Sequence, residues 1–275
     1  MNKFSVLISI YYKESPIYFR EALDSVFAQT LLPAEIVLVK DGPLTPELDA
    51  IIEEYAARHP IFKIVTNETN LGLGRALAKG LLACSYEYVA RMDTDDLIAP
   101  TRFEKEIRKL DEGYDVVGCL STMFENDISR PLATRARPET HEDIIKLAKK
   151  RTPLCHAATV FRKSVVLMAG NYQHCFQFED YHLWVRMILC GAKFYNIQEV
   201  LYYVRVSIGT IDRRGGGKYM VNENKAMYYF YKIGFYSFPE FVRNAVIRSC
   251  VRMMPVKLRS RILHWSWYRQ DRNRK

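Results

Sequence analysis

Short β-rich segments alternate with amphipathic helical segments over the first 92 residues, and this alternation constrains the fold more than any other feature. The β-rich segments are 6–10, 36–39, 62–65 and 88–92, and the helical segments between them are 16–27, 46–58 and 73–83. This order predicts an α/β fold in which helices cover both faces of a mostly parallel central sheet. Ligands of such open sheets bind beyond the C-terminal ends of the strands. We therefore expect functional residues directly after the strands.

The most informative strand end is Arg91-Met92-Asp93-Thr94-Asp95-Asp96. Three carboxylates in four residues after an apolar strand are unfavourable unless a cation offsets their charge. Hard oxygen ligands suit Mg²⁺ or Mn²⁺, and such an ion usually completes its shell with phosphate oxygens and water. The segment predicts a divalent metal that binds together with a nucleotide diphosphate. The alternative is a solvated acidic turn before the helix that follows Pro100.

Two further segments each allow a functional and a structural interpretation. Residues 70–75, NLGLGR, contain GxG, but Leu77 occupies the third glycine position of a dinucleotide-binding fingerprint, so that match fails. Arg75, near a helix N-terminus, either contacts phosphate or nucleobase or is an ordinary surface arginine. Glu179 and Asp180 open another helix, where they either provide a general base or simply favour the helix dipole.

Taken together, six segments resemble, in order, the motifs of the family 2 glycosyltransferases, which are inverting enzymes with a GT-A (nucleotide-diphospho-sugar transferase) fold. The segments are 5–9 with Tyr11 and Glu14, 39–42, 70–74, 93–96, 155–164 and 179–180. The resemblance covers about residues 3–210. One departure is Ala157, because the family usually has proline after the histidine that corresponds to His156. The sequence most resembles bacterial glycosyltransferases of O-antigen, capsule and exopolysaccharide assembly.

The resemblance implies a set of site residues. The donor-nucleotide set is Ser9, Tyr11, Glu14, Asp41, Asn70, Gly72, Arg75, Asp93 and Thr94. The implied metal, Mn²⁺ or Mg²⁺, is held chiefly by Asp95 with Asp93 in support. Asp180 is preferred to Glu179 as the catalytic base, and His156 and Trp184 are assigned to the acceptor side. Trp184, Tyr202 and Tyr203 are candidates for an acceptor groove and equally for the core.

The implied reaction transfers a sugar, with inversion, from a nucleotide-diphosphate sugar to a saccharide hydroxyl. UDP is the favoured nucleotide, and the acceptor is expected to be linked to polyprenyl diphosphate. A sugar nucleotidyltransferase is a rival, but it would normally carry a glycine-rich signature after the first strand, where residues 11–14 read YYKE. A non-catalytic carbohydrate- or lipid-binding protein with the same fold is the second rival.

Charge divides the chain. Residues 211–275 contain 15 Lys/Arg and 4 Asp/Glu, whereas residues 1–210 sum to −2. We therefore expect a GT-A catalytic domain over 1–210, with a donor-binding half at about 1–98 and an acceptor-side half at about 99–210. Residues 211–275 are expected to form a flexible loop and a basic amphipathic helical extension. Arg213 and Arg214, in the glycine-rich part of that loop, are candidates for closing over the diphosphate.

The basic extension predicts contact with an anionic surface. Helices are expected at about 238–253 and 256–268, and the second interleaves tryptophans and leucines with basic residues, as an interfacial helix on anionic lipid does. The alternative is a helix packed on the catalytic body. No nucleic-acid motif accompanies the charge, and neither a signal peptide nor a transmembrane segment is expected. The sequence thus predicts a cytoplasmic protein peripherally associated with the inner face of the cell membrane.

Overall fold

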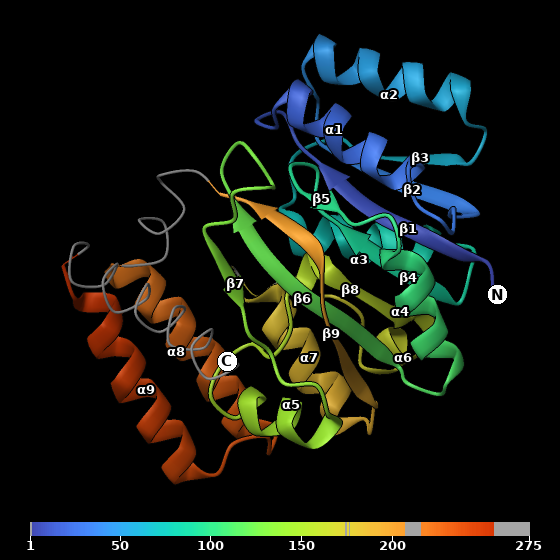
Figure 1. Cartoon of the computed structure of the whole chain (residues 1–275). Coiled ribbons are helices and arrows are strands. Elements are labelled where there is room, and N and C mark those ends of the chain that lie inside the picture. Colours follow the sequence, from blue (N-terminus) through green and yellow to red (C-terminus); the bar gives the residue numbers. More distant parts are fainter. Residues whose placement is uncertain (1, 174, 176, 207–215, 256–275) are drawn as a thin grey trace.

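The computed structural model describes residues 2–173, 175, 177–206 and 216–255 (Figure 1). These residues contain one mixed nine-stranded sheet in the order β3-β2-β1-β4-β8-β6-β9-β5, with β7 paired to β6. The strands are β1 Phe4–Ile10, β2 Glu35–Asp41, β3 Phe62–Asn67, β4 Tyr88–Met92, β5 Leu97–Ile98, β6 Val116–Phe124, β7 Ala133–Arg135, β8 Thr159–Arg162 and β9 Phe194–Arg205. The helices are α1 Pro16–Phe27, α2 Pro46–Arg58, α3 Leu73–Ala83, α4 Arg102–Asp111, α5 His141–Ala148, α6 Lys163–Met168, α7 Glu179–Leu189, α8 Gly217–Lys232 and α9 Phe238–Met253.

The N-terminal half of the sheet is parallel. Strand β1 pairs in parallel with β2 and β4, and β2 pairs in parallel with β3. Helices α1 and α2 begin where predicted because Ser15 and Thr45 accept backbone N–H groups with their side chains and a proline follows each of them. The predicted α/β fold with flanking helices is confirmed, and this half of its sheet is parallel as expected.

The C-terminal half of the sheet is mixed. Strand β8 lies antiparallel to both β4 and β6, and it joins the two halves. In the sequence, residues 194–197 and 201–206 have the pattern of two separate strands. The structure joins them in one long strand, β9, whose pairing with β6 shifts register on either side of Leu120. This irregularity explains the apparent break in the sequence pattern, because a bulge interrupts the alternation of side chains across a sheet.

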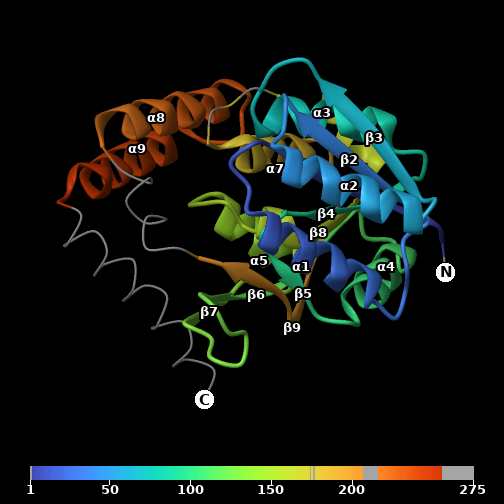
Figure 2. The ribbon, with the colours of Figure 1, turned by 90° about the horizontal axis from the view of Figure 1, so that it is seen from above.

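Helices cover both faces of the sheet (Figure 2). Helices α1, α2 and α4 bury their apolar sides against one face, and α3, α6 and α7 bury theirs against the other. The carboxyl ends of β1, β2 and β4 therefore lie along one edge between these layers. The turns that follow these strands carry the predicted site residues.

Helices α8 and α9 lie side by side at one end of the molecule (Figures 1 and 2). Their inner residues Met227, Phe230 and Tyr236 pack against Tyr181 and Val185 of α7. The predicted helical extension is thus confirmed for 217–253. The expected domain boundary at 210 and the expected helix at 256–268 lie outside the described residues. None of the described helices is both long enough and apolar enough to cross a membrane.

Candidate active site

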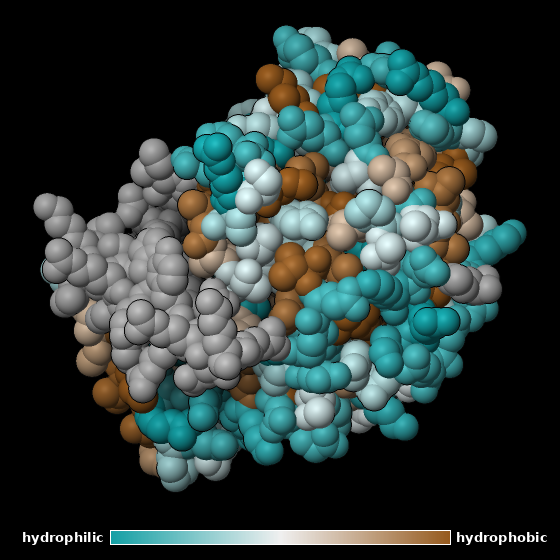
Figure 3. Space-filling model, in the orientation of Figure 1, coloured by the Kyte–Doolittle hydropathy of each residue, from teal (hydrophilic) through white to brown (hydrophobic). Residues whose placement is uncertain are grey.

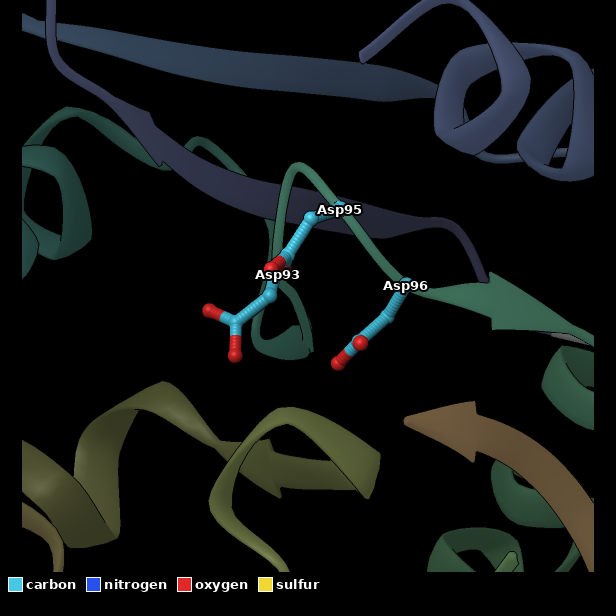
Figure 4. Close-up of side chains that lie close together, drawn as sticks. All are labelled: Asp93, Asp95 and Asp96. Carbon is cyan, nitrogen blue, oxygen red and sulfur yellow. The ribbon is translucent and has the colours of Figure 1, made fainter. Parts of the chain in front are cut away.

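Three carboxylates converge in the turn that follows β4. Within the part of the chain that the structure describes, Asp93, Asp95 and Asp96 each place an oxygen within 4.8 Å of the others. Figure 4 shows the side chains leaving one turn between β4 and β5 and pointing to the same side of it. The predicted cluster is present, and its oxygen donors are those that Mg²⁺ and Mn²⁺ prefer.

Repulsion in this cluster is visible in the pKa values. Burial, and then the charge of Asp93, raises the pKa of Asp95 to about 6. Glu14, in the loop after β1, has its pKa raised to about 7 by burial and then by Asp95, although the Thr94 hydroxyl donates to its carboxylate. Burial raises the pKa of Asp96 well above its usual range. A divalent cation would relieve this repulsion, so the residues present fit a metal.

Arg91, two residues before Asp93, and Tyr202, which is remote in sequence, hold one side of the turn. The buried guanidinium of Arg91 donates to the Asp93 carboxylate. The hydroxyl of Tyr202, on β9, accepts the backbone N–H of Asp93 at 3.2 Å and donates to the carboxylate of Asp96. Tyr202 is fully buried, so it supports the turn from beneath and does not line an acceptor groove.

Arg205 holds the other side. Its backbone N–H donates to Asp96 Oδ1 at 2.7 Å, and its Nε donates to the Asp95 carbonyl at 2.9 Å. Its guanidinium also pairs with Glu21 of α1 and lies 4.1 Å from the ring centroid of Tyr18. Asp96 is buried and accepts from Arg205, whereas Asp93 and Asp95 are only partly buried. No local signal in the sequence pointed to Arg205.

The loop after β2 is tied to the turn before α3. The buried carboxylate of Asp41 accepts the backbone N–H groups of Leu71 and Gly72, both at 2.9 Å. Gly42 has φ +91°, and a Cβ there would lie 2.8 Å from the backbone nitrogen of Asn70, so this close approach requires glycine. Asp41, Asn70 and Gly72 therefore form one unit beside the sheet edge.

The remaining donor-side residues occupy the same edge of the sheet. Ser9 is half-buried near the end of β1, and Tyr11 is half-buried in the loop that follows. Thr94 is buried, and Arg75 is exposed near the start of α3. Their contacts with a nucleotide stay predictions.

Glu179 and Asp180 lie at the N-terminus of α7. Asp180 Oδ2 accepts from the hydroxyl of Thr152 at 3.0 Å. Glu179 packs on α3 so closely that a Cβ added at Gly74 would lie 2.8 Å from its Cγ, and burial raises the pKa of its carboxyl. Asp180 also interacts electrostatically with Tyr172, as does Asp93, so Tyr172 lies between the two acidic sites.

Arginines that the sequence reasoning missed lie near Asp180. Burial and the nearby charges of Arg135 and Arg151 lower the pKa of Arg137 to about 9, and the charge of Asp180 opposes this. The buried Nε of Arg137 has no hydrogen-bond partner among the described residues. Arg137, with Arg135 and Arg151 beside it, thus forms a positively charged region next to Asp180. The sequence held only a weak signal for them, the repeated arginines of residues 135–137.

The two residues predicted on the acceptor side, His156 and Trp184, lie in different surroundings. The Nε2 atom of His156 lies 2.8 Å from the Tyr172 hydroxyl, and burial holds the pKa of His156 well below its usual range. The acceptor-side prediction for Trp184 is wrong, because this side chain is fully buried and packs edge-on against Phe161 and Phe194. Helix α7 turns Trp184 into the core, so it cannot line a groove.

Comparison with known proteins identifies the family of this chain. The model of the family described as "Glycosyl transferase family 2" matches residues 5–167. The chain belongs to glycosyl transferase family 2. It is 37% identical, over 94% of both chains, to an Escherichia coli UDP-Gal:alpha-D-GlcNAc-diphosphoundecaprenol beta-1,3-galactosyltransferase. It is 39% identical to the amylovoran biosynthesis glycosyltransferase AmsE of Erwinia amylovora, over 93% of this chain and 96% of that one.

Solved structures establish the GT-A fold of this glycosyltransferase. The mannosyltransferase PcManGT from Pyrobaculum calidifontis, in complex with GDP-Man and Mn²⁺, matches with a TM-score of 0.66 and 17% identity over 90% of this chain and 69% of that one. Residues 1–349 of S. aureus TarS, in complex with UDP-GlcNAc, match with a TM-score of 0.64 and 19% identity over 82% of this chain and 65% of that one. Arg213 and Arg214 lie outside the described residues, so their predicted contact with the diphosphate stays a prediction.

Proposed function

We propose that this glycosyltransferase is metal-dependent and inverting, and that it moves a sugar from a UDP-sugar to a hydroxyl of a polyprenyl-diphosphate-linked saccharide in bacterial surface polysaccharide synthesis. The observation that carries the proposal is the convergence of Asp93, Asp95 and Asp96 in one turn, with Glu14 beside them. The names of the E. coli and Erwinia relatives support the donor, the lipid-linked acceptor and the polysaccharide pathway.

On the donor side, Asp95 and Asp93 would hold Mn²⁺ or Mg²⁺. When bound, this ion would neutralise the charge that develops on the departing diphosphate. Asp41, Asn70 and Gly72 form the unit expected to receive the nucleobase and ribose. Arg91 keeps the Asp93 carboxylate oriented through a buried hydrogen bond.

On the acceptor side, Asp180 is the proposed general base. It takes the proton from the acceptor hydroxyl as the hydroxyl oxygen attacks the anomeric carbon on the face opposite the leaving diphosphate. The bond to the new oxygen forms as the bond to the diphosphate oxygen breaks. An α-linked donor therefore gives a β-linked product. Thr152, which donates to Asp180, orients the carboxylate.

The surroundings of Asp180 support an anionic acceptor. In this proposal Arg135, Arg137 and Arg151 would meet the diphosphate of a lipid-linked saccharide, since arginine side chains pair well with phosphate oxygens. Such an acceptor resides in a membrane. We accordingly propose that the protein is cytoplasmic and peripherally associated with the inner face of the cell membrane.

A direct assay tests the proposal. The protein is incubated with Mn²⁺, a synthetic polyprenyl-diphosphate monosaccharide and a panel of UDP-, GDP- and dTDP-sugars, and the anomeric configuration of any product is read by NMR. We expect transfer from one α-linked UDP-sugar to give a β-linkage, and transfer to cease with a chelator. An α-linked product would contradict inversion, and undiminished transfer in the presence of chelator would contradict the metal site.

A further inference from the structure

Helix α9 turns its polar residues inward. Asn244 is buried, and its side-chain amide donates to the Lys149 carbonyl at 2.9 Å. Arg248 and Arg252 both pair with the buried carboxylate of Glu223 on α8, and the Arg252 Nε lies 2.7 Å from it. The inner face of α9 thus combines an ion-pair layer with Phe241 and Ala245, which pack against the apolar cluster of α7 and α8.

Several other apolar residues of α9 point outward, together with the exposed Arg243. Large apolar side chains with exposed fractions between 41% and 62% are Phe238, Val242, Val246, Ile247 and Met253. Phe238, Val242 and Val246 follow one another at intervals of four residues, so they form a continuous stripe along the helix. Figure 3 shows hydrophobic atoms at the edge of the molecule where α9 lies. A single exposed apolar residue is ordinary, but a continuous stripe marks an interaction surface.

Helix α8 exposes a neighbouring stripe that is basic. Its exposed residues Lys218, Val221, Lys225, Tyr228 and Lys232 recur at intervals of three and four. The Tyr228 ring lies 6.0 Å from that of Phe241 on α9, which brings the two stripes together. We call the two stripes together the α8–α9 outer face: the five α8 residues just named with Phe238, Val242, Val246, Ile247 and Met253.

The acidic side chains of α8 and α9 are not on the outer face of the helix pair. Residues 216–255 contain two acids, and both are engaged away from the outer face. Glu223 is buried with its two arginines, whereas Glu240 accepts from the backbone of Ser237 and pairs with Lys149 at 3.3 Å. The outer face is left with lysines and apolar side chains.

We propose that the α8–α9 outer face is the surface on which this protein lies on an anionic lipid bilayer. Apolar side chains between exposed lysines match a membrane interface, where the former enter the acyl boundary and the latter meet lipid phosphates. A second copy of the chain fits poorly, because a symmetric contact would bring like-charged lysines together.

This inference rests on the proposed function, because it supplies the surface for a membrane-borne acceptor. Helix α8 begins close to the catalytic region. Tyr219 in its first turn lies 5.2 Å, between ring centroids, from Phe178, the residue directly before Glu179. A bilayer on the outer face thus lies against the helix pair that adjoins the start of α7.

Vesicle co-sedimentation tests the surface with the full-length chain. The double variant Val242→Glu/Val246→Glu is compared with Leu82→Glu/Leu189→Glu, which alters two exposed apolar residues on α3 and α7. With phosphatidylcholine vesicles containing phosphatidylglycerol, we expect the first variant to lose roughly tenfold or more in apparent affinity, and the control to bind like the parent. Equal binding by all three proteins would overturn the proposal.

A fluorescent probe identifies the occupant of the face even if the double variant misfolds. Cys250 on α9 and Cys190 at the end of α7 are both exposed, so an environment-sensitive label is placed on Cys250 in Cys190→Ser and on Cys190 in Cys250→Ser. We expect the label on Cys250 alone to shift to the blue on adding anionic vesicles. Blue-shifted emission from the Cys250 label in buffer alone would overturn the proposal. If that emission does not depend on protein concentration, residues 256–275 cover the face. If it does depend on protein concentration, a second copy of the chain covers it.

Titration of the same proteins with UDP distinguishes failure of the lipid-surface proposal from failure of the proposed function. Nucleotide binding without vesicle binding would refute the lipid surface alone. Vesicle binding without nucleotide binding would refute the proposed donor and leave the surface in place.

Discussion

The turn after β4 and the N-terminus of α7 both present adjacent acids, but their surroundings are opposite. Asp93, Asp95 and Asp96 lie together with Glu14, and burial, followed by this accumulation of negative charge, raises the pKa values of Asp95 and Glu14. Asp180 instead lies within electrostatic range of Arg137, which has Arg135 and Arg151 beside it. The first site therefore favours a cation and the second an anion.

This difference suits the two acidic sites to different substrates, the donor and the acceptor. The β4 turn is suited to the donor, because a metal ion and a diphosphate together balance its charge. The α7 terminus is suited to an anionic acceptor and to proton removal. In the proposed mechanism, aspartates at the two sites therefore have different roles because the surrounding charges differ.

Replacement of the proposed base should have the largest effect. We expect Asp180→Asn to lower kcat by about 10²–10⁴-fold, because general-base catalysis typically contributes that much. UDP affinity should stay unchanged, since Asp180 lies outside the donor site. Glu179→Gln is the matched control and should lose far less. A larger loss in Glu179→Gln would exchange the roles of the two acids.

Loss of a metal ligand comes next. We expect Asp95→Asn to weaken Mn²⁺-dependent UDP binding on the order of 100-fold, because a carboxylate ligand is removed from a hard cation. Asp96→Asn is the comparison, since the Asp96 carboxylate accepts the Arg205 N–H and an amide oxygen can still accept it. Calorimetry measures both. Equal losses would show that the metal is held by Asp96 as well.

The arginines beside Asp180 give a smaller, acceptor-specific effect. Arg137→Met should raise the acceptor KM about tenfold, as expected for one charge-assisted hydrogen bond. The donor KM should not change. Arg130→Met, at the exposed surface of the connection between β6 and β7, is the control. An increase confined to the donor KM would move these arginines to the nucleotide side.

The pH dependence of metal binding should be the mildest effect. A carboxyl with a raised pKa is ionised above that pKa and loses its charge below it. Because the pKa of Asp95 is about 6 and that of Glu14 about 7, Mn²⁺ affinity should be complete at alkaline pH and decline as pH falls through this range. Glu14→Gln should remove the upper part of the decline. Affinity independent of pH between about 5.5 and 8 would contradict the charge accumulation at this turn.

The N-terminal half of the fold was predictable because its signals are local. Helix α1, for example, carries its own cap at Ser15 and its own apolar stripe, and β4 is an apolar run between polar turns. Strand β8, four residues long, was missed because its identity depends on pairing with β4 and β6. Strand β9 was divided because a register shift breaks its alternation.

The site residues also divide into those with a local signal in the sequence and those without one. The carboxylates after β4 were predicted because three like charges within four residues are unfavourable unless a cation offsets them. Tyr202 and Arg205 were missed as supports because each lies 109 positions from the residue it contacts in the turn. Trp184 was misassigned because an aromatic residue four positions after Asp180 suits a groove and a core equally. Only the packing against Phe194 decides between them.

Calorimetric titration of UDP into the parent protein, Asp95→Asn and Asp180→Asn, each with and without Mn²⁺, tests the separation of the two acidic sites most directly. We predict Mn²⁺-dependent binding to the parent, the same binding to Asp180→Asn, and its loss in Asp95→Asn. Undiminished metal-dependent binding to a folded Asp95→Asn protein, or its loss in Asp180→Asn alone, would contradict the account.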